Sequence, residues 1–152
     1  MTVPRRAPPR LRFGTVGLRV TDLKRSLRFY TRGLGLRVIK RGDTRSWGGG
    51  LWVFLEDPKT RAKVELNWYP KGSRFYVPYL AGEGVDHLDF SIGTAPRASL
   101  EAAYQRLLRF GAGKTGYEPA TTEGWMASVT DPDGIWITIG RSPTRSERAS
   151  LS

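Results

Sequence analysis

The chain runs twice through the same order of predicted elements, β-α-β-β-β. In the first half a β-rich run at 15–20 precedes a helical pattern at 23–31, where apolar residues recur every three or four positions. Strand patterns follow at 36–40, 51–57 and 63–68, separated by glycine and proline turns. Such short elements with tight connections indicate a sheet with one covering helix.

The second half repeats this order. A strand pattern at 86–92 precedes a helical pattern at 97–110, and short strand patterns follow at 114–117, 125–130 and 135–139. A period of about 70 residues that occurs twice is too long and too rare for a solenoid. The sequence therefore predicts an α+β fold of two βαβββ modules, forming a curved mixed sheet with the helices on its outer face. The alternative is an ordinary α+β sheet domain whose halves look alike by chance.

Two local matches align the halves with each other. Asp57, followed by proline, precedes Glu65 in an apolar strand, much as Asp131, also followed by proline, precedes Thr138. Likewise the last two residues of the run at 15–20 lie ahead of the first helix much as Ser91 and Ile92 lie ahead of the second. The aligned pairs are Thr15 with His87 and Glu65 with Thr138.

The ends of the chain have little apolar surface to bury. Residues 1–12 are rich in arginine and proline, and residues 141–152 are polar, so both are expected to be disordered tails. Between them we expect one domain over 13–140, with modules at 13–72 and 84–140.

Composition narrows the possible functions. The chain has no cysteine and one histidine, which excludes disulfides, Cys-ligated metals and thiol chemistry. Its net charge is +11, but a net five of these charges lie in residues 1–10 and 141–152 and acids are interspersed in the remainder, so we expect no specific nucleic-acid partner. No apolar run is long enough to span a membrane, and a cytoplasmic protein is expected. The scarcity of Asn and Gln is typical of a thermophile, and a GC-rich genome would also favour the abundant Arg, Gly, Ala and Pro.

Four segments together resemble the vicinal oxygen chelate superfamily, which includes glyoxalases, extradiol dioxygenases and bleomycin resistance proteins. The strand–helix opening at 18–38 and the turn at 130–139 carry the most specific likeness, together with 64–70 and 84–92. The resemblance is strongest to glyoxalase-type lyases, because Glu65 and His87 lie where that branch has ligands.

The resemblance implies a divalent metal (Zn, Ni, Mn or Co) held at four strand positions. These positions correspond to Thr15, Glu65, His87 and Thr138. Two of them are threonine, whose neutral hydroxyl is a poor metal ligand. The implied ligands are thus Glu65 and His87, with Thr15 and Thr138 as pocket hydroxyls, and any metal is expected to be weakly held.

The reaction that the resemblance implies is proton abstraction next to a carbonyl, by a lyase/isomerase or an epimerase. A carboxylate serves as the base while a cation or hydrogen-bond donors stabilise the enediolate. Glu65 is the candidate catalytic base. The alternative function is a metal-free small-molecule binding protein like the resistance proteins.

The segment 67–84, which joins the modules, is rich in aromatic and basic side chains. It is either an interface clamp or a pocket rim that meets a small organic substrate or ligand, for which an anion suits the basic domain. We also expect a homodimer. The candidate substrate-binding residues are Asn67, Tyr69, Arg74, Tyr76 and Tyr79.

Overall fold

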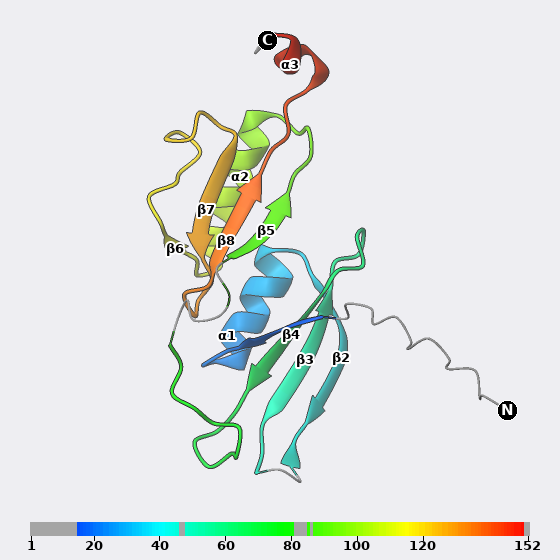
Figure 1. Cartoon of the computed structure of the whole chain (residues 1–152), viewed down its shortest axis with the longest axis vertical. Helices are drawn as coiled ribbons and strands as arrows, with labels where there is room; N and C mark the ends of the chain where they lie inside the picture. Colours follow the sequence, from blue (N-terminus) through cyan, green and yellow to red (C-terminus); the bar gives the residue numbers. More distant parts are fainter. Residues whose placement is uncertain (1–14, 46–47, 81–84, 86, 151–152) are drawn as a thin grey trace, which may run out of the picture.

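The computed structural model describes residues 15–45, 48–80, 85 and 87–150, and the predicted tail at 1–12 lies outside them. The strands form two four-stranded sheets, in the orders β1-β4-β3-β2 and β5-β8-β7-β6 (Figure 1). In the first sheet the strands are β1 (Val16–Arg19), β2 (Arg37–Asp43), β3 (Leu51–Glu56) and β4 (Lys63–Trp68). In the second they are β5 (His87–Ser91), β6 (Gly113–Lys114), β7 (Met126–Thr130) and β8 (Trp136–Gly140).

The first module has a helix in two parts. Helix α1 (Leu23–Arg28) begins after Asp22, whose carboxylate accepts a hydrogen bond from the Arg25 amide at 3.0 Å, and continues as the π-helical turn η1 (Phe29–Gly33). The wider turn buries the consecutive aromatic residues Phe29 and Tyr30 together, whereas a regular 3.6-residue period predicts only the second of them at the core. The second module has one regular helix, α2 (Arg97–Arg109).

Each helix covers one face of its own sheet. In the first module Leu18 and Leu66 are paired across β1 and β4 and fully buried, and in the second Ile137 and Val129 are paired across β8 and β7. Alternation along each strand turns the intervening side chains to the opposite face. The sheet of each module therefore has two faces. One is apolar and packs against the helix, and the other, called the open face below, is not covered by a helix.

The two modules lie end to end along the long axis of the molecule, as Figure 1 shows. The predicted α+β fold of two βαβββ modules is confirmed, but within one chain the described strands form two separate sheets, and β1 and β5 are edge strands.

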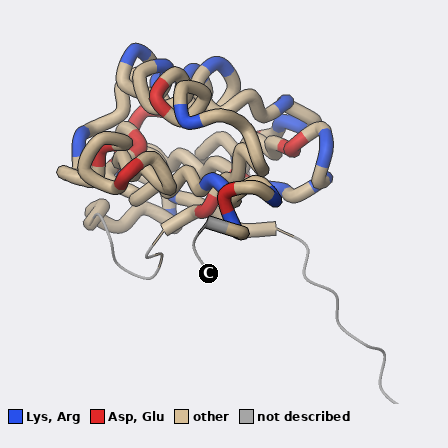
Figure 2. The backbone as a smooth tube through the Cα atoms, turned by 90° about the horizontal axis from the view of Figure 1, so that it is seen from above, with Lys and Arg blue, Asp and Glu red and all other residues tan. Residues whose placement is uncertain are grey.

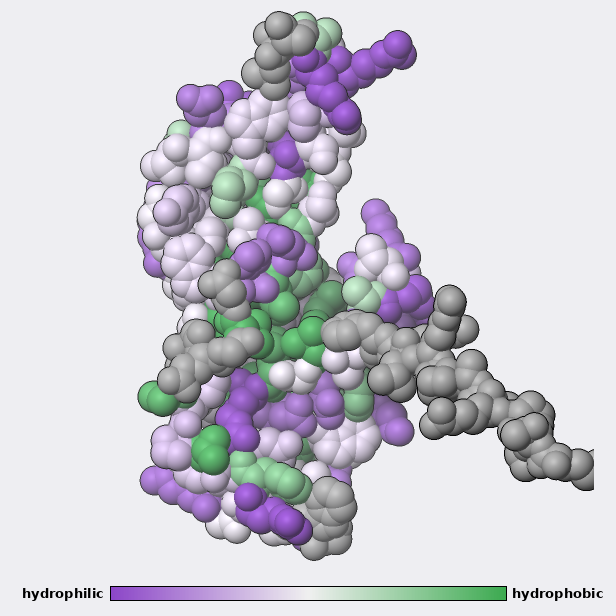
Figure 3. Space-filling model, viewed as in Figure 1, coloured by the Kyte–Doolittle hydropathy of each residue, from purple (hydrophilic) through white to green (hydrophobic). Residues whose placement is uncertain are grey.

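Apolar side chains gather at the waist between the modules (Figure 3). A cavity of about 520 Å³ there is lined by Val16, Val64, Leu88 and Phe90, among others.

The turn after β7 holds the two modules together. Asp133, whose side chain is fully buried, accepts hydrogen bonds from Arg25 Nη2 and Ser26 Oγ, both at 2.8 Å, and from the amide and hydroxyl of Thr21. Beside it, Asp131 accepts a hydrogen bond from the Tyr30 hydroxyl at 2.9 Å. The second module thus places two carboxylates against the helix of the first.

The C-terminal end differs from the predicted disordered tail, because Arg145–Ser150 forms helix α3. Arg141 anchors it: its side chain is 2% exposed, its guanidinium lies 4.9 Å from the Trp125 ring centre, and it donates to both oxygens of Glu147 at 2.7 and 2.8 Å. A buried guanidinium needs a paired carboxylate, and α3 supplies it.

The pairing of α3 with Arg141 should come apart in acid. Hydrogen bonds from Thr144 and then Arg141 lower the pKa of Glu147 from 4.5 to about 2, so this pairing stabilises the folded end above pH 4.5 and weakens as the pH falls toward 2. The protection factors of the α3 amides, which are exchange rates corrected for the intrinsic effect of pH, should stay constant down to about pH 4 and then fall. Glu147→Gln should show the low protection factors already at pH 7. Equal protection in the variant and the parent at pH 7 would contradict this assignment.

Basic positions are spread around the outside of the molecule with acidic ones between them (Figure 2). None of the helices in the described ranges is long and apolar enough to cross a membrane.

Candidate functional site

The two parallel strand pairs have equivalent registers. Gly17 on β1 lies opposite Glu65 on β4, and Asp89 on β5 lies opposite Thr138 on β8. Thr15 precedes Gly17 by two residues, as His87 precedes Asp89. Residues two apart on a strand share a face, and so do direct partners. The four positions aligned from the sequence are therefore related by the internal repeat, and all lie on the open sheet sides.

Glu65 is a half-buried carboxylate on the open face of the first module, which is the side away from helix α1. It lies opposite Phe54 on β3 and beside Gly17 on β1, where a Cβ would come within 3.8 Å of Glu65 Oε2. Among the described carboxylates only Glu65 and Glu123 have neither a hydrogen bond nor an ion pair, and Glu123 is exposed. Glu65 is thus the one partly buried carboxylate in the described part of the chain that is not used for structure.

An aromatic pair and an amide flank Glu65 on the same face. The rings of Trp52 and Phe54 meet edge to face at 5.6 Å, and a side chain at Gly42 would overlap the Trp52 indole. Asn67, two residues after Glu65, accepts from the Tyr69 hydroxyl at 3.4 Å through its carbonyl oxygen. Its amide nitrogen lies 3.4 Å from the Cβ position of Gly17, on the Glu65 side. This face therefore combines a carboxylate, an amide donor and an apolar wall.

His87 lies on the open face of the second module. Its Nε2 lies 3.3 Å from Asp89 Oδ2, and both side chains are substantially exposed. Thr138 lies opposite Ser128 on β7, whose buried hydroxyl has no hydrogen-bond partner among the described residues. The second face thus supplies an imidazole, the carboxylate of Asp89 and two hydroxyls.

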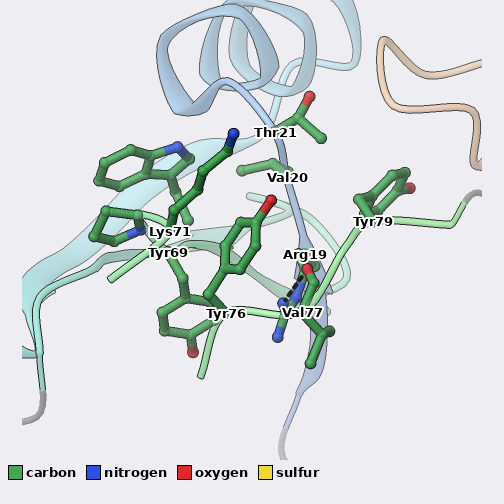
Figure 4. A pocket seen from close by; sticks show the side chains of 10 residues that line it. Arg19, Val20, Thr21, Tyr69, Lys71, Tyr76, Val77 and Tyr79 are labelled. Atoms are coloured by element: carbon green, nitrogen blue, oxygen red, sulfur yellow. Dashed lines mark hydrogen bonds between the residues drawn. The ribbon is translucent and has the colours of Figure 1, made fainter. Parts of the chain in front are cut away.

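The segment after β4 forms a separate pocket at the edge of the first sheet. A cavity of about 260 Å³ is lined by Tyr69, Lys71, Tyr76 and Tyr79, among others, and Figure 4 shows Tyr76 between Lys71 and Tyr79. Arg19 closes one side, donating to the carbonyls of residues 75 and 77 at 2.8 and 3.2 Å.

Two observations refine the predicted rim. Burial, and then the carboxylates of Asp131 and Asp133, raise the pKa of Tyr79 to about 12, so this phenol stays protonated at neutral pH. Arg74 is exposed, lies 5.6 Å from the Phe75 ring centre and does not line the pocket. The cations of the pocket are instead Arg19 and Lys71.

The structure brings some of the predicted residues together and leaves others apart. Glu65 and Asn67 share one face and His87 and Thr138 share another, but the two faces belong to different sheets of the chain. Sequence reasoning missed Phe54, Asp89 and Ser128. The alternation along 51–57 and 86–92 places the first two on these faces, whereas nothing in the sequence marks the serine.

Two βαβββ modules with equivalent parallel strand pairs define the glyoxalase fold class. The chain belongs to the Glyoxalase/Bleomycin resistance protein/Dioxygenase superfamily, whose family model matches residues 12–139.

Curated relatives include lactoylglutathione lyase from Salmonella typhimurium, 29% identical over 128 residues that cover 80% of this chain and 86% of the relative. A probable chloroplastic lactoylglutathione lyase from Arabidopsis thaliana is 28% identical, over 83% of this chain. The match spans only 35% of that longer relative.

Solved structures share the fold at lower identity. Glyoxalase I from Leishmania major superposes with a TM-score of 0.67 at 24% identity, covering 93% of this chain and 94% of that one. The fosfomycin resistance protein FosX from Listeria monocytogenes, in complex with Mn(II) and sulfate, gives a TM-score of 0.61 at 15% identity, covering 90% and 96%.

The donor set of this chain does not fit a four-ligand metal cage. The repeat-related positions hold Thr15, Glu65, His87 and Thr138, of which one carboxylate and one imidazole are good ligands for a first-row divalent metal. No three His, Asp or Glu side chains of the described residues converge as a metal site. The chemistry of the site is therefore derived from the side chains alone.

Proposed function

We propose that this protein is a glyoxalase-like lyase, isomerase or epimerase that removes a proton next to a carbonyl, with Glu65 as the base. The observation that carries the proposal is that Glu65 is half-buried on an open sheet face without a hydrogen bond or ion pair to any described residue. A carboxylate that is not neutralised by the protein is available to accept a proton from a bound substrate.

The groups around Glu65 can support such a step. The Asn67 amide is positioned to donate a hydrogen bond to the oxygen that gains charge as the enediolate forms. The Trp52 and Phe54 rings form an apolar wall on one side of the face, against which a substrate carbon chain could pack. On the second face, Thr138 supplies a further hydrogen-bond donor, and the imidazole of His87 is the group proposed to return a proton to the carbon, while Glu65 releases the abstracted proton to solvent. A divalent metal held only by Glu65 and His87 would bind weakly, and no part of this proposal depends on it.

We further propose that the complete site forms across a homodimer. Among the described strands, the two open faces lie on separate, end-to-end sheets, and β1 and β5 are edge strands, each with one side that no described strand pairs. If β1 of one chain lies beside β5 of a second chain, Glu65 and His87 face each other across the junction. A closed two-fold arrangement then makes two equivalent sites.

A metal-free binding protein on the same scaffold is the second candidate. Thr15 and Thr138 in place of charged ligands, together with the aromatic wall beside Glu65, favour it. Such a protein would hold a small organic molecule between the two faces and leave its carbon–hydrogen bonds intact.

Solvent exchange separates the two candidates. The proposed enzyme should catalyse deuterium incorporation from D₂O next to the carbonyl in a panel of 2-oxo compounds and 2-hydroxyacyl thioesters that includes S-lactoylglutathione, followed by NMR. Glu65→Gln should slow this exchange by about 10²-fold or more, because the amide cannot accept the proton. Glu123→Gln, which alters an exposed carboxylate that likewise has no hydrogen bond or ion pair with any described residue, should leave the rate unchanged. No exchange on any member of the panel, or equal rates in the Glu65 variant and the parent, would contradict the enzyme proposal.

A further inference from the structure

A cleft on the helix side of the molecule lies away from the proposed site. It has a volume of about 450 Å³ and is lined by residues of α1 and of the C-terminal end of α2. Helix α1 packs on the Leu66 side of β4, whereas Glu65 points to the opposite side of the same strand. A ligand in this cleft therefore cannot touch the groups of the proposed reaction.

The charge of the cleft is strongly unbalanced. Four cations line it, Lys24, Arg25, Arg28 and Arg109, against the single carboxylate of Asp22, which already caps α1. Arg25 is paired with Asp133 at 2.8 Å. The other three cations have no hydrogen bond or ion pair with any described residue. Their mutual repulsion would be relieved by a bound anion.

The cleft is built from both modules and is held in place. The Arg28 guanidinium lies 5.6 Å from the centre of the Phe110 ring, which follows α2. Arg106 donates two hydrogen bonds, at 3.0 and 2.7 Å, to the carbonyl of Arg32 in η1. Gly33 allows this approach, because a Cβ there would come within 3.3 Å of the Leu107 side chain. The cations of α1 and α2 are thus brought together only by the folded two-module chain.

We propose that this cleft binds a small, multiply charged phosphoryl anion, such as the diphosphate group of a metabolite. Two guanidinium groups present paired N–H donors that match phosphate oxygens, and a lysine adds a third charge. The cavity has room for a diphosphate and for an apolar or ring moiety against Phe110. The ligand would act from outside the reaction site, by fixing the two modules relative to each other.

Calorimetric titration with inorganic pyrophosphate and orthophosphate tests the site in the full chain. Pyrophosphate should bind more tightly than orthophosphate, with one site per chain. The double variant Arg28→Gln/Arg109→Gln should weaken pyrophosphate binding by about 10²-fold, because each guanidinium that is removed takes away a charge-assisted hydrogen bond that supplies roughly a factor of ten. A control variant of equal charge, Arg37→Gln/Lys59→Gln, removes two exposed cations outside the cleft and should change the affinity less than about twofold.

Three results would overturn the proposal: no pyrophosphate binding at millimolar concentration, equal weakening in both double variants, or a stoichiometry well above one. The second and third results would show that pyrophosphate is attracted to the overall positive charge of the chain rather than to this cleft. Circular dichroism should confirm that both variants are folded, since all four side chains lie at the surface. The outcome is independent of the exchange experiment on Glu65.

Discussion

Replacing Thr15 by His and Thr138 by Glu should convert this chain into a tight metal-binding protein. The two threonines occupy the same register positions as His87 and Glu65 in the internal repeat. The double variant therefore presents two imidazoles and two carboxylates if the open faces meet across the proposed dimer. Two added good ligands should raise Zn(II) affinity by on the order of 10⁴-fold over the parent.

A competition titration with a chelating dye measures this gain directly. Each single variant, Thr15→His or Thr138→Glu, should give part of it, and Glu65→Gln in the double-variant background should remove most of it. A matched pair, Thr94→His with Thr121→Glu, adds the same groups at exposed positions outside the sheets and should leave the affinity near that of the parent. An equal Zn(II) affinity for Thr15→His/Thr138→Glu and for this control would show that positions 15, 65, 87 and 138 do not converge.

Removing the Asp133 carboxylate should strongly destabilise the folded chain. This fully buried group accepts hydrogen bonds from Arg25, Ser26 and Thr21 and links the second module to the first helix. Asp133→Ala leaves the buried Ser26 hydroxyl and the Thr21 groups without their acceptor, and it removes the partner of Arg25, whose side chain is 45% exposed. We expect the free energy of unfolding to fall by about 2–4 kcal/mol, mainly because donors beside a buried carboxylate lose their acceptor.

Urea denaturation measures this decrease, and the internal repeat supplies its control. Asp57, in the corresponding turn of the first module, is partly exposed and accepts hydrogen bonds from the amides of Lys59 and Thr60 at 2.7 and 2.8 Å. Asp57→Ala should cost about 1 kcal/mol, because water can replace the missing acceptor. Similar decreases for the two variants would contradict the bridging role of Asp133.

The order of elements could be predicted because each element is specified locally. The predicted strand at 63–68 is β4 as observed, and the predicted helix at 97–110 ends one residue earlier in the structure. Two features depend on tertiary contacts and could not be predicted. The π-helical turn η1 follows from burying Phe29 and Tyr30 together, and α3 forms because buried Arg141 needs Glu147.

The site could be predicted only in part. Alternation and the repeat place Thr15, Glu65, His87 and Thr138 on equivalent faces, because strand geometry is periodic. The separation of the two sheets within one chain depends on how the modules pack, which no local pattern encodes. The same holds for Asp133, which the sequence marks only as part of a turn although it contacts residues more than 100 positions away.

Mixing a Glu65→Gln chain with a His87→Ala chain tests whether Glu65 of one chain and His87 of another form one reacting site. A dimer of one Glu65→Gln chain with one His87→Ala chain has one site with both substitutions and one site with neither. After random re-association, we predict that solvent deuterium exchange recovers to about a quarter of the wild-type rate, since half of the dimers are mixed and half of their sites are intact. A mixture that exchanges deuterium no faster than the two variants measured separately would contradict a site that is shared between two chains.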